Sequence, residues 1–421
     1  MIQTISLLPG ITLRIFPDSR FKQGCLSVQL LRPMRREEAS LNALISSVLL
    51  RGCEKYPDLQ QITWRLDDLY GAAVGTLARR IGDCQTMGLY LSFLEDRFAL
   101  PGDQILQPML ELLEQLLLHP VTEGKGFCSA YVESEKKNLI STIESELNDK
   151  RAYAMGQMLK NMCREDSYGI PRLGDVDSVA AIDPVAAYTH YRRILRESPV
   201  ELFYVGSAPA EEVAAGLKKI FEKLDRQEIV YPKTAPFRSA GQTDEQKEMA
   251  VTQAQLCLGF VTPITNRQTD YAAMQVANTV FGSGMTGKLF MNVREKMSLC
   301  YHIGSSYYGS KGIVTVSAGI DAAKAETVKE EVLRQLRACR EGNISDEELR
   351  SAKEALLSGL RATHDAPGSI EGYYSTAAIS GLSLTPEQYM EKIRAVTRED
   401  AARAAGTVRL HSAFLLKGVG E

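Results

Sequence analysis

The sequence predicts an α+β protein built from two homologous domains, each a mainly antiparallel sheet covered by helices. Strand-like and helical patterns recur in the same order in both halves of the 421-residue chain. Corresponding segments lie about 220 residues apart. A polar stretch with two prolines separates the halves and reads as a linker. We therefore expect domains over 1–231 and 251–421, a linker over 232–250, and a clam-shell arrangement with a ligand cavity.

The elements of the first half follow from hydrophobic periodicity and from residues that begin or end helices. Gly52 closes a helix pattern as a C-cap residue, and Asp183 before Pro184 begins another. The predicted elements are strands at 11–16 and 25–33, helices at 39–52 and 59–72, strands at 76–81 and 87–94, a helix at 109–118, a long helical stretch at 129–162, a helix at 179–195 and a strand at 200–206.

The second half repeats this order. The strand 255–263 ends in proline, as 25–33 does, and the strand 412–418 closes the copy as 200–206 closes the first. Between them we expect helices at 270–284 and 288–297, strands at 301–308 and 313–320, a helix at 325–336, a second long helical stretch opening at 344–360 and a helix at 396–405.

Composition excludes several classes of function. A formal net charge of −3 argues against nucleic acid or an anionic membrane as the main partner. The sequence shows neither a secretion signal nor an apolar run long enough to span a bilayer, so we expect a cytoplasmic protein. Its eight cysteines are scattered without a C-x-x-C pair, which is typical of reduced, buried thiols.

A glycine-rich loop at 282–288 fits two nucleotide-binding patterns, G-x-G-x-x-G and G-x-x-x-x-G-K. A phosphate-binding loop needs Ser or Thr after its lysine, and this chain has Leu289 there. Such a loop also follows a buried strand, whereas this one follows a helix pattern. The simpler interpretation is a turn between helices that needs the backbone freedom of glycine.

The five histidines offer no two-histidine metal face, because no two are three or four residues apart on a helix. Runs rich in Glu and Lys, such as 131–151, are most simply solvated helix faces.

Arg294 and Tyr301 are the strongest candidates for chemistry. Leu289, Phe290, Val293 and Met297 form the expected buried stripe of the 288–297 helix, with Arg294 at its edge. Tyr301 begins the next strand, so both side chains can point into one space. Alone, the pair also fits a boundary arginine and a half-buried strand tyrosine.

The whole chain resembles the insulinase/pitrilysin family of zinc metallopeptidases, in its short form related to the mitochondrial processing peptidase. The resemblance rests on the duplicated halves and on the segments VLLRGCEKYP and LFMNVREKMSLCYHI. The second segment resembles the family pattern L-F-x-x-V-R-E-K-x-G-L-x-Y and departs mainly at Ser298, where glycine is usual. The resemblance implies that Arg294 and Tyr301 reach the substrate at the zinc.

The family's inverted zinc motif, H-x-x-E-H, is missing. Its positions read Ala43-Leu44-Ile45-Ser46-Ser47, so both histidine ligands and the glutamate base are absent. The third ligand position aligns best with Thr142, with Glu144 close by. Without these groups the chain has no means to hold zinc or activate its water.

This combination predicts a non-catalytic subunit of a heterodimeric metallopeptidase. Arg294 and Tyr301 would act in trans, this chain would hold no cofactor, and zinc would lie in a paralogous partner that shares a peptide or unfolded polypeptide substrate. Two alternatives remain: a peptide-binding or structural scaffold with no role in hydrolysis, and a metallopeptidase with unorthodox ligands such as His119 or His190. Within the family, the chain is similar to zinc-less bacterial members linked with aminopentanol modification of elongation factor P.

Overall fold

The computed structural model describes residues 2–146, 148–239 and 241–419. The chain forms two compact units. Unit 1 contains the residues through Glu144, together with Pro171–Lys233 and His364–Thr376, and unit 2 contains Ser145–Ile170, Thr234–Thr363 and the residues from Ala377 on. Each unit therefore includes one segment from the other half of the sequence.

Unit 1 contains a six-stranded sheet of order β1-β2-β8-β3-β5-β4, in which only β2 and β8 run parallel. Its strands are β1 Gln3–Leu8, β2 Ile11–Pro17, β3 Gln23–Pro33, β4 Ala73–Ile81, β5 Cys84–Leu94 and β8 Val200–Gly206, with a separate pair β6 Thr122–Glu123 and β7 Gly126–Phe127. Its helices are α1 Arg36–Leu49, α2 Leu59–Asp68, α3 Leu106–Leu118, α4 Ser129–Ser145, α6 Val176–Ala180, α7 Pro184–Glu197, α8 Ala210–Phe221 and most of α12 Pro367–Ser380.

Unit 2 contains a five-stranded sheet of order β11-β12-β10-β13-β9, in which only β13 and β9 run parallel. Its strands are β9 Thr243–Glu248, β10 Ala254–Val261, β11 Cys300–Tyr308, β12 Ile313–Ile320 and β13 Arg409–Lys417. Its helices are α5 Lys150–Met162, α9 Tyr271–Asn278, α10 Ala325–Arg340, α11 Asp346–Ala362, α13 Pro386–Ala395 and α14 Arg398–Ala405, with two π-helical segments at Thr279–Ser283 and Leu289–Lys296. Short 3₁₀ turns lie at Asp96–Phe98, Ser167–Gly169, Ala322–Lys324 and Thr363–Asp365.

The sheets confirm the predicted duplication and fold class. The order β8-β3-β5-β4 in unit 1 recurs as β13-β10-β12-β11 in unit 2. The parallel neighbour of the closing strand also recurs, because β2 lies beside β8 as β9 lies beside β13. The second copy therefore begins with β9, inside the stretch that its composition marks as a linker.

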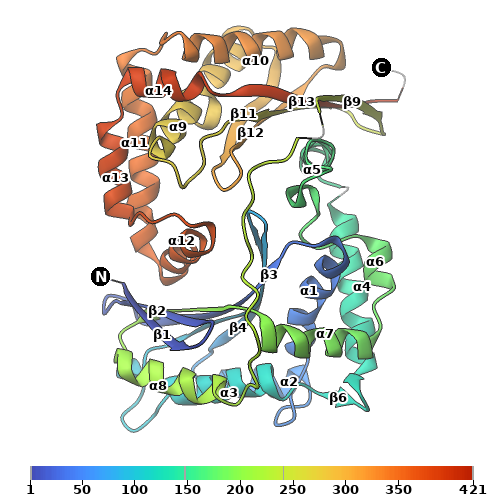
Figure 1. Cartoon of the computed structure of the whole chain (residues 1–421), viewed down its shortest axis with the longest axis vertical. Coiled ribbons are helices and arrows are strands. Elements are labelled where there is room, and N and C mark those ends of the chain that lie inside the picture. Colours follow the sequence, from blue (N-terminus) through green and yellow to red (C-terminus); the bar gives the residue numbers. More distant parts are fainter. Residues whose placement is uncertain (1, 147, 240, 420–421) are drawn as a thin grey trace. The chain divides into compact units, whose positions relative to one another are not determined.

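Each sheet is covered on both faces. In unit 1, α3 and α8 pack on one face (Figure 1), where the main core gathers, and Ile370 of α12 packs with Cys25 and Val205 on the other. In unit 2, α9, α10 and α14 cover one face, while Ala154, Met158 and Met162 of α5 pack against strands β10 and β13 on the other.

The two predicted long helical stretches are each broken, and the helix after the break belongs to the other unit. Asp149 ends the first stretch by accepting the backbone amides of Arg151 and Ala152, which begins α5 in unit 2. In the second, α11 ends at Ala362 and α12 starts at Pro367, in unit 1. Buried Glu371 of α12 accepts hydrogen bonds there from Ser27, Gln29 and Arg79. This reciprocal exchange ties both halves of the chain into both sheets.

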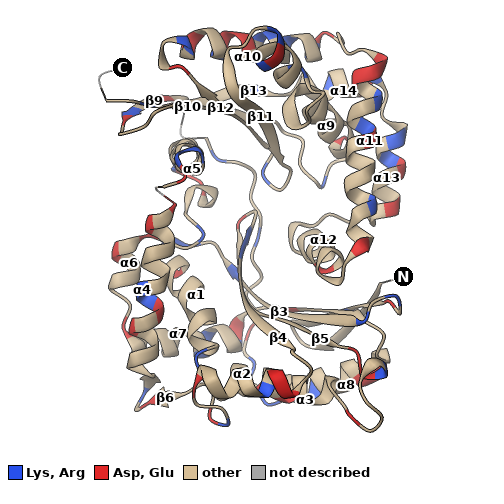
Figure 2. Cartoon of the chain, turned by 180° about the vertical axis from the view of Figure 1, so that it is seen from behind, with Lys and Arg blue, Asp and Glu red and all other residues tan. Residues whose placement is uncertain are grey.

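Charged residues of both signs alternate along α10, α11 and α13 (Figure 2). In the run 131–151, which was expected to be a solvated helix face, Glu133, Lys137, Glu144 and Glu146 are exposed, whereas Glu135 is buried.

Candidate functional sites in each unit

The positions of the missing zinc motif lie on α1 of unit 1. Ala43 is buried, and Ser47, one helical turn further on, is partly exposed. Both line a cavity of about 290 Å³, and Thr142 of α4 lines the same cavity. The remaining lining residues are Thr76, Ala78, Glu135, Asn138, Leu139, Arg172 and Leu173. The structure thus brings Ala43, Ser47 and Thr142 to one cavity, whereas the neighbouring Glu144 is exposed and does not line it.

Ser46 stands where the family has its glutamate base, and its side chain is fully buried. The hydroxyl accepts a hydrogen bond from the backbone amide of Gly88 (3.1 Å) and donates one to the carbonyl of Leu77 (3.3 Å). These two residues are paired across β4 and β5. Ser46 therefore anchors α1 to the sheet and is not available as a base.

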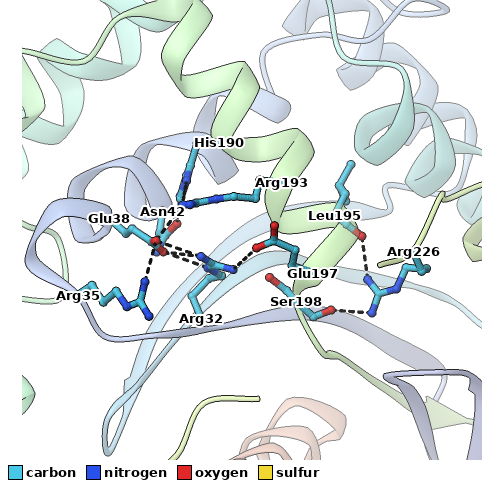
Figure 3. A network of polar contacts seen from close by, with 10 residues as sticks. All are labelled: Arg32, Arg35, Glu38, Asn42, His190, Arg193, Leu195, Glu197, Ser198 and Arg226. Atoms are coloured by element: carbon cyan, nitrogen blue, oxygen red, sulfur yellow. Dashed lines mark hydrogen bonds and ion pairs between the residues drawn. The ribbon is translucent and has the colours of Figure 1, made fainter. Parts of the chain in front are cut away.

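A buried polar network joins the first turn of α1 to β3 and α7 (Figure 3). Glu38 of α1 binds Arg32 of β3 and Arg193 of α7, with contacts of 2.8–3.0 Å. Burial opposes ionisation of Glu38, yet the charges of Arg32 and Arg193 and the hydrogen bond from Arg32 keep its pKa below the usual value. Ion pairs with Arg35 and Glu197 extend the network at 3.7–3.8 Å.

His190 joins this network as a neutral imidazole. Arg193 can only donate, so Nδ1 of His190 accepts its hydrogen bond (3.0 Å) and Nε2 donates to Oδ1 of Asn42 (2.8 Å). Asn42 in turn donates to Gln85, whose side-chain amide donates to the carbonyl of Arg172. A directed chain of hydrogen bonds thus runs from α7 through α1 to the wall of the cavity.

We expect stability to fall in mild acid because of His190. Burial lowers its pKa from 6.5 to about 4. Between pH 6.5 and 4, His190 is therefore protonated in the unfolded chain but stays neutral in the folded chain. Its contribution to the free energy of unfolding is complete above pH 6.5 and is lost as the pH falls toward 4. The free energy of unfolding should fall by up to about 3 kcal/mol, because each unit of difference in pKa corresponds to about 1.4 kcal/mol.

Urea unfolding at pH 7 and pH 4.5 measures this effect. A His190→Gln variant, which has no titrating group at this position, should lose less stability over the same interval. An identical pH dependence in both proteins would contradict the assignment.

The two histidines considered as unorthodox ligands do not gather at the cavity. Both ring nitrogens of His190 are engaged, and His119 lies at the end of α3 between Glu54 and Glu114, at 3.7 and 3.9 Å. Within the described ranges, no three His, Cys, Asp or Glu side chains form a group suited to a metal ion.

Arg294 lies in unit 2 on the π-helical segment Leu289–Lys296. Its side chain is 40% exposed, stacks over the ring of Phe290 (4.7 Å to the centroid) and lies 3.6 Å from the carboxylate of Glu295. Leu289 and Val293 are buried as predicted, but the predicted burial of Met297 is wrong, since it is 45% exposed. The wide π-helical turn shifts side chains away from the spacing of an α-helix, and such turns are frequent at functional sites.

Tyr301 follows the end of this helix as the extra residue of a β-bulge. Cys300 pairs with Ile320 and His302 with Gly319, so Tyr301 has no opposite residue. Its side chain is 70% exposed, and its hydroxyl has no hydrogen-bond partner in the described part of the chain. Bulges often re-aim a side chain next to an active site.

Ser298 connects the two residues in a left-handed conformation, with φ of 50°. Glycine adopts this conformation without strain. This explains why glycine is usual at this position in the insulinase/pitrilysin family. Ser298 thus adopts a backbone conformation that glycine would adopt more easily, and it is strained there.

The lysine of the glycine-rich loop does not face a phosphate site. Lys288 is buried and binds both carboxylate oxygens of Glu348 (2.8 and 3.0 Å). The ion pair of Lys288 with Glu348 joins this loop to α11.

Comparison with known proteins finds similarity to M16 metallopeptidases and to proteins described as inactive relatives of them. Residues 182–356 match the family model described as "Peptidase M16 inactive domain". Over 97% of the chain, the sequence is 28% identical to the "Probable inactive metalloprotease YmfF" of Bacillus subtilis, of which it covers 96%. The chain is similar to M16 metallopeptidases. It lacks the zinc motif of the active enzymes, because α1 carries Ala43, Ser46 and Ser47 at the three functional positions.

Other known proteins are similar to the chain as well. The chain is 23% identical to an "Uncharacterized zinc protease" of Rickettsia bellii, over 70% of this chain and 72% of that one. A crystal structure of a conserved protein from Enterococcus faecalis is similar over 100% of this chain and 99% of that chain, with a TM-score of 0.93 and 26% identity. An M16 inactive domain from Pseudomonas fluorescens shares the fold over 99% of this chain and 98% of that chain, with a TM-score of 0.82 and 18% identity.

No helix among the described residues has the length and apolar character needed to cross a bilayer.

Proposed function

We propose that this chain is the zinc-less subunit of a two-subunit peptidase and supplies Arg294 and Tyr301 to a zinc-bearing paralogous partner. The observation that carries the proposal is the contrast between its two candidate sites. The α1 cavity has Ala43, Ser47 and Thr142 at the positions of the zinc ligands, and Ser46 stands at the position of the base. Unit 2 carries a half-exposed arginine and, on a bulge, an exposed tyrosine hydroxyl with no partner among the described residues.

Each residue has a role that its chemistry supports. The planar guanidinium of Arg294 binds a peptide carbonyl or carboxylate through its fork of donors. The hydroxyl of Tyr301 would donate a hydrogen bond to the oxyanion of the peptide carbonyl under attack, and zinc in the partner would supply the activated water. The partner supplies the zinc and the base, and the substrate is a peptide or unfolded polypeptide.

The proposal is tested in the mixed complex of this chain with a similar-length M16 protein bearing an intact H-x-x-E-H. Loss of one oxyanion donor typically costs about a hundredfold or more in turnover, so we expect Tyr301→Phe to lower kcat by at least that factor. Arg294→Ala removes a substrate-binding group, and we expect it to lower kcat/KM severely. Peptide hydrolysis by purified mixed complexes measures this, and co-purification confirms that assembly is intact.

Matched control variants change the same residue types elsewhere. Arg350→Ala alters an exposed arginine of α11, and Tyr231→Phe alters an exposed tyrosine. Both should keep full activity. Full activity in the Arg294 and Tyr301 variants would instead favour a binding scaffold without a role in hydrolysis, and one zinc per purified chain would revive the metallopeptidase alternative.

A further inference from the structure

Unit 2 contains a second cavity, of about 690 Å³, next to the segment that carries Arg294 and Tyr301. Its walls come from the start of α5, the glycine-rich loop and the hairpin β11–β12. The lining residues are Asp149, Arg151, Ala152, Met155, Gly282, Ser283, Gly284, Met285, Phe290, Ile303, Gly304, Ser305, Ser306, Tyr308, Thr315 and Ser317. A volume of this size is typical of ligand sites.

The two charged residues of this cavity, Asp149 and Arg151, differ in their contacts. Its carboxylate, Asp149, is the N-cap of α5, and its Oδ1 atom accepts two backbone amides. Arg151 is exposed, and no carboxylate of the described residues lies within 4.0 Å of its guanidinium. The ring of Phe290, which also lines the cavity, carries the stacked guanidinium of Arg294.

His302 reports on the electrostatics of this region. Its Nε2 atom is buried without a hydrogen-bond partner. Burial lowers the pKa of His302, and Arg151 and Arg294 lower it further. Two cations from different elements therefore act together here. His302 itself does not line the cavity, so it indicates the combined field of Arg151 and Arg294 and is not a ligand-binding group.

The backbone of β11 supplies a further feature that suits a peptide. β11 is an edge strand of its sheet, with β12 as its neighbour on one side. Its other edge presents backbone amides and carbonyls to an extended chain, which is a common mode of peptide recognition. Serines and glycine of β11 along the cavity, Gly304, Ser305 and Ser306, leave room for such a segment.

We infer that this cavity receives an acidic segment of a peptide, with Arg151 as the anchoring cation and the edge of β11 as the docking strand. The inference rests on the proposed function, since it names the class of substrate that the unit-2 site takes. Arg151 is a binding residue in this scheme and takes no part in bond cleavage.

The test measures binding by the full chain alone, without the zinc-bearing partner. Three fluorescein-labelled, unstructured peptides of equal length differ only in a central run of four Glu, Gln or Lys residues. Partly exposed ion pairs contribute about 1 kcal/mol, or about fivefold in Kd. By fluorescence anisotropy we expect the Glu peptide to bind at least fivefold tighter than the Gln peptide, and the Lys peptide to bind most weakly.

Two variants locate the effect. Arg151→Gln should remove the preference for Glu, whereas Arg350→Gln, an equal loss of charge on α11 outside the cavity, should keep it. Equal binding of the Glu and Gln peptides, no binding of any peptide, or a preference that survives Arg151→Gln would overturn the inference. Each of these outcomes is independent of hydrolysis in the mixed complex, so failure here is distinguishable from failure of the proposed function.

Discussion

Replacing Lys311 by Met should destabilise unit 2 by about 3–5 kcal/mol. Lys311 lies between β11 and β12 with its side chain 0% exposed, and its ammonium binds both oxygens of Asp166 at 2.9 and 3.0 Å. Asp166, at 2% exposure, also accepts the backbone amides of Tyr168 and Arg238. The pair thus joins the turn after α5, the segment at 235–238 and the β11–β12 hairpin. Without Lys311, a carboxylate stays buried and loses its cation.

Urea unfolding followed by circular dichroism measures the loss. Lys324→Met, which removes an exposed lysine of the same unit, should change stability by less than about 0.5 kcal/mol. Asp166→Asn combined with Lys311→Met should recover part of the loss, because no uncompensated charge then remains buried. A loss below about 1 kcal/mol for Lys311→Met alone would contradict this account.

Separated halves of the chain should fail to fold. A fragment of residues 232–421 lacks α5, whose Ala154, Met158 and Met162 are fully buried against the sheet of unit 2. A fragment of residues 1–231 lacks α12, and so leaves Arg79 without Glu371 and one face of its sheet uncovered. Loss of the two buried methionines alone costs about 4–10 kcal/mol, which is comparable with the whole stability of a typical domain.

Co-expression of the same two fragments tests the cause. Together they contain both exchanged helices, so we expect them to co-purify and to unfold cooperatively, while each alone is insoluble or lacks a thermal transition. Cooperative unfolding of the 232–421 fragment alone would show that α5 is dispensable.

The sequence was most informative where local rules act. Alternating apolar residues predicted the paired strands, and the recurrence of proline-ended strands predicted the duplication that the sheets confirm. Asp183 before Pro184 predicted the start of α7, and the side chain of Asp183 accepts two backbone amides there. These features depend on neighbours in the chain, so they are visible without tertiary contacts.

Features that depend on distant contacts were missed. Helical periodicity continues through 129–162, so the sequence predicts one long helix. Asp149 alone indicates that a new helix, α5, begins there, and nothing local indicates that α5 packs on the sheet of unit 2. The π-helical turn at Leu289–Lys296 likewise has no clear sequence signature, so Met297 was assigned to a buried stripe that an α-helix would have required.

The candidate sites divide in the same way. Arg294, Tyr301 and the missing zinc motif could be recognised because they lie in short segments that match a family pattern. The cavity at Arg151 could not, because it combines α5, the glycine-rich loop and β11, which are far apart in the sequence. His302 gives no signal until its burial and unpaired nitrogen are known.

Ser46 makes the loss of the zinc site difficult to reverse. Its hydroxyl occupies a closed space between α1 and the paired residues Leu77 and Gly88. A glutamate at this position would bring a larger, charged side chain into that space, and it would also remove the hydrogen bonds that anchor the helix. Restoring the histidines at Ala43 and Ser47 would therefore not be sufficient. Hydrolysis by this chain would require a repacked contact between α1 and the strands β4 and β5, in addition to new metal ligands.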